Sequence, residues 1–84
     1  MKPATLESLA AISKEVARAR EKHPGNAHLL AALVEEVGEL AKDLLEGNPG
    51  WRAEAIQVAT VAVRILEEGD GDFHQHTGEK CSKP

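Results

Sequence analysis

Two stretches of this sequence, residues 27–46 and 49–68, carry aliphatic side chains around too much of a helix for an ordinary surface position. At about 100° per residue, the apolar positions of the first stretch cover close to half of the circumference, and those of the second cover well over half. A helix with so wide an apolar arc is either central in its fold or shared between subunits. The sequence therefore predicts helices that are enclosed by other helices.

Turn-forming residues divide the chain into three helical segments, which we place at roughly residues 5–22, 27–46 and 49–68. Asn26 and Asn48 are suited to cap the second and third helices, with Pro49 in the first turn of the third, and Gly47 is suited to end the second. We expect an all-α domain over residues 1–70. Its antiparallel helical hairpins, built from three main helices, would complete a larger bundle by dimerisation. Residues 71–84 read as a polar, flexible C-terminal tail with one short turn at Phe73.

Length and charge restrict the possible partners. A chain of 84 residues is near the lower limit for folding alone, which favours a homodimer or a dimer of dimers. Residues 27–70 carry nine acidic and three basic side chains, a distribution that argues against binding a nucleic acid polymer. No segment is apolar enough to cross a membrane or to act as a signal peptide, so we expect a cytoplasmic protein. His74, His76 and Cys81 are soft ligands, but one cysteine makes a zinc site improbable.

Four oxygen-bearing side chains have spacings that suit a cation site. Glu36 and Glu39 lie one turn apart on the second helix, and Glu54 and Gln57 lie one turn apart on the third. Two such pairs on facing helices would form a cage of oxygen ligands, which hard cations such as Mg²⁺ prefer. The alternative interpretation is that the glutamates are only the solvated face of an amphipathic helix.

Glu54 makes the cation interpretation the stronger one. It falls on the apolar side of the third helix, with Val58 and Val61, and should point inward. A carboxylate in that position needs a cation or a hydrogen-bond partner, because burying an isolated charge is very costly. The alternative is a glutamate in the first turn that interacts with the positive end of the helix dipole.

Two neighbouring segments read HLLAALVEEVGELAKDLLEG and WRAEAIQVATVAVRILEEGD. Together they resemble the MazG-like, all-α nucleoside triphosphate pyrophosphohydrolase family, and the resemblance covers roughly residues 5–70. The family pattern is E-E-x-x-E on one helix and E-x-x-D on the next. It is matched by three glutamates of the second helix and by Glu54, whereas Gln57 stands where the family usually has aspartate.

The resemblance implies a dimeric helical bundle, or a dimer of dimers, that cleaves a nucleoside triphosphate to the monophosphate and pyrophosphate with Mg²⁺, or with Mn²⁺. It makes Glu36, Glu39 and Glu54 metal ligands. Glu35 and Glu39 become the candidate catalytic carboxylates. The resemblance leaves three roles open for Glu35: a metal ligand, a residue that contacts the ligands, or a base that orients water. Gln57 is a candidate metal ligand through its carbonyl oxygen, but it removes one negative charge and cannot act as a base.

Three further residues are candidates for substrate binding. Arg20 and Lys42 are suited to phosphate, and Trp51 is suited to stacking on a nucleobase. Each has a structural alternative: a cation near a helix end, an ion pair within a helix, and a ring that closes the end of the bundle.

The leading hypothesis is thus a Mg²⁺-dependent nucleotide pyrophosphohydrolase. The competing hypothesis, which Gln57 supports, is a catalytically weakened helical dimer that binds nucleotide, or acts as an interaction module, without hydrolysis. A third is an oligomerising adaptor.

Overall fold

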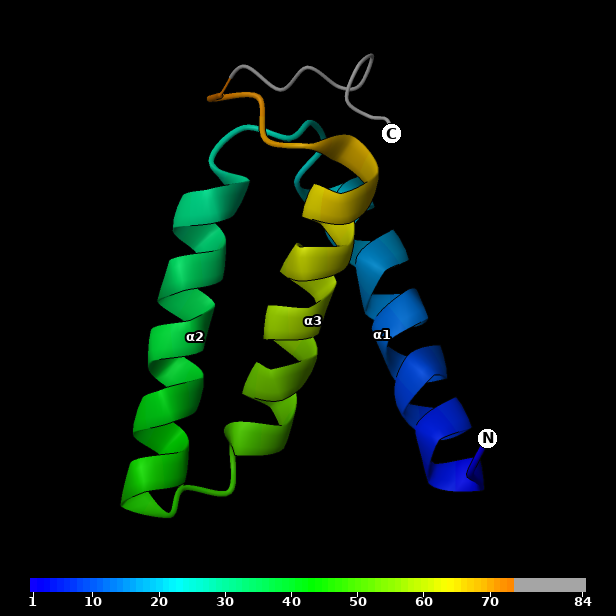
Figure 1. The fold of residues 1–84 in the computed structure, drawn as a ribbon, viewed down its shortest axis with the longest axis vertical. Coiled ribbons are helices and arrows are strands. Elements are labelled where there is room, and N and C mark those ends of the chain that lie inside the picture. Colours follow the sequence, from blue (N-terminus) through cyan, green and yellow to red (C-terminus); the bar gives the residue numbers. More distant parts are fainter. Residues whose placement is uncertain (74–84) are drawn as a thin grey trace.

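The computed structural model describes residues 1–73, and within that range the chain forms three helices and no strand. The helices are α1 (Pro3–Lys22), α2 (Leu29–Glu46) and α3 (Trp51–Glu68), arranged as in Figure 1. The predicted all-α fold of three helices is therefore confirmed. None of these helices has the length and apolarity that crossing a membrane would require.

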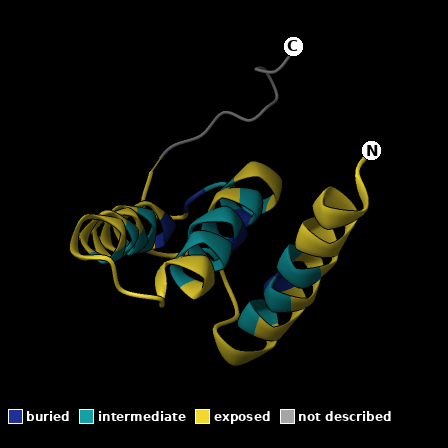
Figure 2. Ribbon diagram, turned by 90° about the horizontal axis from the view of Figure 1, so that it is seen from below, coloured by how far each residue is buried: buried dark blue, intermediate teal, exposed yellow. Residues whose placement is uncertain are grey.

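Helix α3 is the centre of the molecule. It packs against α1 on one side and against α2 on the other, and the described parts of α1 and α2 do not pack against each other (Figure 1). Seen from below, the partly buried surfaces of the outer two helices face α3 (Figure 2). The wide apolar arc of residues 49–68 is explained in part by these two partners.

A buried arginine fixes the loop between α1 and α2. Arg64 of α3 is almost fully enclosed, and its Nη2 atom donates hydrogen bonds to the carbonyl oxygens of His23 (3.0 Å) and Gly25 (2.6 Å). Its guanidinium also pairs with Glu68 one turn later, at 3.3 Å. The guanidinium thus satisfies two loop carbonyl oxygens that lie outside the hydrogen-bonding pattern of the helices, and it holds the loop over the end of α3.

The start of α2 differs from the prediction. The helix begins at Leu29, and Asn26 is not its cap, because the Asn26 Nδ2 atom donates to the carbonyl oxygen of Glu68 at 2.7 Å. The capping group is instead Asp70, whose Oδ2 atom accepts a hydrogen bond from the backbone N–H of Leu30 at 2.6 Å. A carboxylate at this end of a helix satisfies a free N–H and interacts favourably with the helix dipole. The segment after α3 therefore closes the start of α2.

The first residues of the expected tail belong to this closure. Gly71 donates its backbone N–H to the Asn26 carbonyl at 3.0 Å, and a Cβ at position 71 would lie 2.6 Å from Asn26 Oδ1. Asp72 Oδ2 accepts from the backbone N–H of His28 and lies 2.7 Å from its Nδ1 atom. The Phe73 N–H bonds the Asp70 carbonyl, which forms the expected turn. The rest of the tail, with His74, His76 and Cys81, lies outside the described residues.

The connection between α2 and α3 is partly as predicted. Gly47 ends α2 in the left-handed conformation, with φ 72°, as expected for a C-terminal glycine. Helix α3 begins at Trp51 rather than at Pro49, and the predicted cap is wrong, because Asn48 Nδ2 bonds Asp43 Oδ1 at 3.2 Å. Helix α1 begins at Pro3, two residues before the predicted start, since proline is well tolerated in a first turn.

Helix α2 also presents an apolar face that none of the described residues covers. Its members recur at alternating steps of four and three residues, and we call them the α2 seam: Leu30, Val34, Val37, Ala41 and Leu44. All five are exposed, and Val34 retains 64% of its accessible surface. Together with the side that packs on α3, the seam accounts for the unusually wide apolar arc of this helix.

Candidate metal centre

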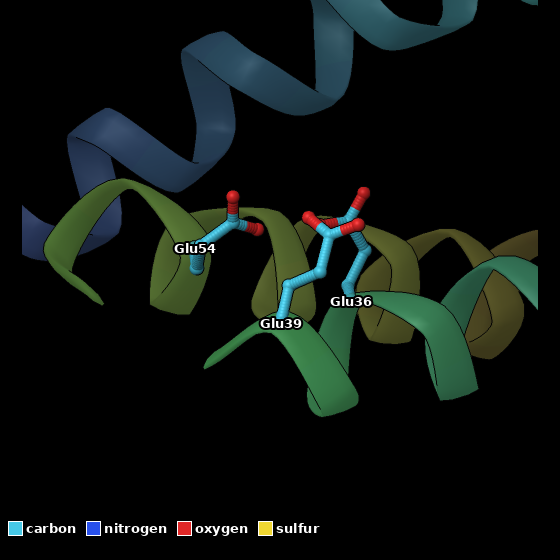
Figure 3. A group of neighbouring side chains, drawn as sticks. All are labelled: Glu36, Glu39 and Glu54. Carbon is cyan, nitrogen blue, oxygen red and sulfur yellow. The ribbon is translucent and has the colours of Figure 1, made fainter. Parts of the chain in front are cut away.

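Three carboxylates from two helices converge on one point (Figure 3). Glu36 and Glu39 lie one turn apart on α2, and Glu54 extends toward them from the first turn of α3. One oxygen from each lies within 4.8 Å of the others. The antiparallel packing of α2 on α3 creates this arrangement, because it sets the first turn of α3 beside the middle of α2.

The cluster is partly withdrawn from water. Glu36 and Glu54 are half-buried, while Glu39 is exposed. The Oε1 atom of Glu54 is buried and has no hydrogen-bond donor among residues 1–73 when the carboxyls are ionised. The expectation that Glu54 points inward is confirmed, and the atom lacks the partner that a buried carboxylate oxygen requires.

Burial and mutual repulsion raise the pKa of two members of the cluster. Burial raises the pKa of Glu36 to about 7, with further contributions from a proton shared with Glu54 and from the charges of Glu54, Glu39 and Glu35. The pKa of Glu39 is raised chiefly by the charge of Glu54. Without a cation, the cluster therefore holds a proton to reduce its charge near neutral pH.

These observations fit a hard divalent cation. A cation beside the three carboxylates would partner the buried Glu54 oxygen and replace the proton on Glu36. Three carboxylates would also leave room around the ion for water and substrate, which is how Mg²⁺ is usually bound. Glu36, Glu39 and Glu54 are the residues that could hold it.

The other two candidates near the cluster are placed differently. Glu35 adds no ligand atom to the group, but its charge contributes to the raised pKa of both Glu36 and Glu39. The Nε2 atom of Gln57 donates a hydrogen bond to Glu15 Oε2 of α1 at 2.8 Å. The amide of Gln57 is thus engaged with α1, and its role as a metal ligand stays a prediction.

A cavity of about 620 Å³ adjoins the cluster. Its floor is α3, its walls are α1 and α2, and the 23–28 loop closes one end. Glu36 belongs both to the carboxylate cluster and to the wall of this cavity. Basic or potentially basic side chains line the same space: Arg18, Lys22, His23, His28 and Arg64. Acidic and basic side chains therefore line the same cavity, which is partly open to solvent.

The three residues expected to bind substrate do not line this cavity. Arg20 forms ion pairs with Glu67 and Glu68 beside a different hollow of α1 and α3. Lys42 is exposed on α2 and does not line the cavity. Trp51 lines a third hollow between the starts of α1 and α3, with the Arg52 guanidinium 5.3 Å from the centre of its ring. None of the three lines the cavity beside the carboxylate cluster, and their substrate roles stay predictions.

Two cavity residues were missed by the sequence reasoning. Glu15 and Arg18 form a two-pronged ion pair on α1, with Nε to Oε1 at 2.9 Å and Nη2 to Oε2 at 2.6 Å. Their spacing of three residues is a sequence signal for the pair, but it carries no signal that the pair faces a cavity.

Comparisons of the chain with protein-family models, with curated proteins and with solved structures found no significant match.

Proposed function

We propose that this protein is a divalent-cation-dependent hydrolase of nucleoside triphosphates, which yields the monophosphate and pyrophosphate, in line with its resemblance to the MazG-like family. Mg²⁺ is the expected cation, with Mn²⁺ as a substitute. The observation that carries the proposal is the position of Glu36, which belongs both to the three-carboxylate cluster and to the cavity with basic lining. A cation at the cluster would reach a polyanion in that cavity.

The reaction adds water to the α-phosphorus. The oxygen of water forms a bond to this phosphorus while the bond to the bridging oxygen of the β-phosphate breaks, and pyrophosphate leaves. A bound Mg²⁺ supplies neutralisation of the phosphate charge. Glu36, Glu39 and Glu54 hold the cation, and either Glu35 or Glu39 accepts a proton from the attacking water. Basic residues of the cavity wall orient the polyphosphate.

Dimerisation is the second part of the proposal. The α2 seam follows the spacing of a coiled coil, which matches a second copy of itself. Its four larger members, with the adjoining Leu45, expose the equivalent of roughly three complete aliphatic side chains. At about 1.5–3 kcal/mol per buried side chain, two copies gain enough to offset an association cost of about 4–15 kcal/mol. A homodimer through α2, or a dimer of dimers, follows.

A product assay tests the enzymatic proposal. The chain is incubated with each ribo- and deoxyribonucleoside triphosphate, with and without Mg²⁺ or Mn²⁺, and monophosphate and pyrophosphate are quantified. We expect metal-dependent release of both products in equal amounts. Glu54→Gln should remove turnover and leave the helical circular dichroism unchanged, because the substitution keeps the shape and removes only the charge. Turnover that survives chelation would contradict the proposal.

The contact between Gln57 and Glu15 favours a second candidate function. The Gln57 amide is neutral and its Nε2 atom is engaged by α1, so it adds no charge to the cluster, which is compatible with a helical dimer that binds nucleotide without hydrolysing it. Saturable nucleotide binding without product would support this candidate, and a large gain of activity in Gln57→Asp would do so too. Absence of both binding and product would leave an adaptor that associates through its apolar faces.

A further inference from the structure

A chain of hydrogen bonds links the helix that carries Glu54 to a cation on α1. Gln57 lies one turn after Glu54 on α3, and its Nε2 atom donates to Glu15 Oε2. The Glu15 oxygens in turn accept from Nε and Nη2 of Arg18. All three side chains line the cavity that contains Glu36.

The geometry restricts Arg18 more than an ordinary surface ion pair would. The Glu15 side chain is only 16% exposed, and donors on two helices bind its carboxylate, so it has little freedom. Two nitrogens of the Arg18 fork bond this fixed carboxylate in parallel, which sets the plane of the guanidinium. Within residues 1–73, Arg18 uses its Nε and Nη2 atoms for hydrogen bonds to Glu15, and its Nη1 atom is left for a ligand. Arg18 therefore presents an oriented donor with 56% of its side chain exposed.

We propose that Arg18 binds the phosphate oxygens of the nucleotide and that Gln57 is a positioning residue, which holds Glu15 and thereby the Arg18 guanidinium against the cavity. The inference rests on the proposed function, because it takes the polyphosphate chain as the occupant of the cavity. Gln57 acts through Arg18, so removing either residue removes the same interaction. The contact with Glu15 of α1 thus gives Gln57 a role that does not require contact with the cation.

Calorimetric titration tests this inference without relying on turnover. Inorganic triphosphate with excess Mg²⁺ is titrated into the full chain, into Gln57→Ala, Arg18→Ala and the double variant, and into Arg52→Ala as a control outside the cavity. We expect each cavity variant to weaken triphosphate binding roughly tenfold, in line with the loss of one hydrogen bond to a charged group. The double variant should be no weaker than Arg18→Ala alone, because the two residues act as a unit.

A second titration separates positioning from metal ligation. Mn²⁺ alone is titrated into the wild-type chain and into Gln57→Ala, and we expect equal affinities. A loss of Mn²⁺ affinity would make Gln57 a metal ligand and overturn the inference, as would additive effects in the double variant or no binding of triphosphate to the wild-type chain. Binding of triphosphate without hydrolysis of any nucleotide would refute the enzymatic proposal alone. Circular dichroism of every variant detects unfolding.

Discussion

Replacing Glu36 by glutamine should stabilise the metal-free protein near neutral pH and remove the stabilisation that Mg²⁺ provides. In the folded chain, burial and three neighbouring carboxylates raise the pKa of Glu36 to about 7, from an ordinary value of 4.5. A carboxyl with a raised pKa stabilises the fold while it is protonated. The stability it contributes is therefore complete below about pH 4.5 and is lost as the pH rises through about 7.

The size of the effect follows from the same numbers. A difference of about 2.5 pKa units corresponds to roughly 3 kcal/mol. Glu36 is only half-buried, so solvent screening reduces this to on the order of 1 kcal/mol. For a domain of this size, about 1 kcal/mol corresponds to a change of roughly 4–8 °C in Tm. The metal-free wild-type protein should lose about that much between pH values of about 5 and 8, and Glu36→Gln should lose much less.

Thermal melts followed by circular dichroism measure both effects. The wild-type chain, Glu36→Gln and the control Glu21→Gln, an exposed residue of α1, are melted with a chelator and then with Mg²⁺ at about ten times its Kd, where a specific ion adds about 1.4 kcal/mol. We expect Mg²⁺ to raise the Tm of the wild type and of Glu21→Gln only. Equal Mg²⁺ stabilisation of Glu36→Gln, or a metal-free Tm below that of the wild type at about pH 8, would refute the reasoning.

Three further predictions concern the rest of the fold. Asn26→Ala removes a side-chain hydrogen bond to the Glu68 carbonyl and should lower the Tm by roughly 4–8 °C. Asn48→Ala is the control, and an equal loss of Tm in both variants would contradict the closure described at the start of α2. Arg18 and Gln57 lower the pKa of Glu15 to about 2, and backbone hydrogen bonds from α2 and Asp72 lower the pKa of Asp70. Both carboxylates therefore stabilise the fold above about pH 4.5 and lose this contribution as the pH falls toward 2. Acid titration followed by circular dichroism should show Glu15→Gln to be less sensitive than the wild type over that range. The double variant Val34→Glu, Val37→Glu should convert the dimer into a monomer in sedimentation velocity, whereas the control Lys42→Glu on the same helix should not. A wild-type chain that sediments as a monomer at micromolar concentration would refute the proposed pairing.

Local sequence signals predicted the helices and the convergence of the carboxylates. Glycine and proline mark the ends of the helical segments, and Gly47 adopts the left-handed conformation that its position indicated. The spacing of Glu36 and Glu39, with the place of Glu54 on the apolar side of its helix, was enough to predict that they meet. Facing helices in a short hairpin leave few other arrangements, so period and spacing carry this part of the structure.

Contacts between distant segments were beyond the reach of those signals. The start of α2 is capped by Asp70, 40 residues further along the chain, so the nearer Asn26 was free to bond the end of α3. Gln57 meets Glu15 only because α1 lies against α3, a position that no local pattern encodes. Arg64 pairs with Glu68 one turn later, a contact that local spacing allows, but its burial against the loop carbonyls depends on tertiary packing.

The position of the bond that water cleaves tests the central proposal most directly. A nucleoside triphosphate is hydrolysed by the wild-type chain with Mg²⁺ in water labelled with heavy oxygen, and the products are analysed by mass spectrometry. Attack at the α-phosphorus predicts one labelled oxygen in the monophosphate and none in pyrophosphate, and no reaction with Glu54→Gln or without the cation. Label in pyrophosphate or in inorganic phosphate, or turnover that does not need Glu54, would contradict the proposed site and reaction.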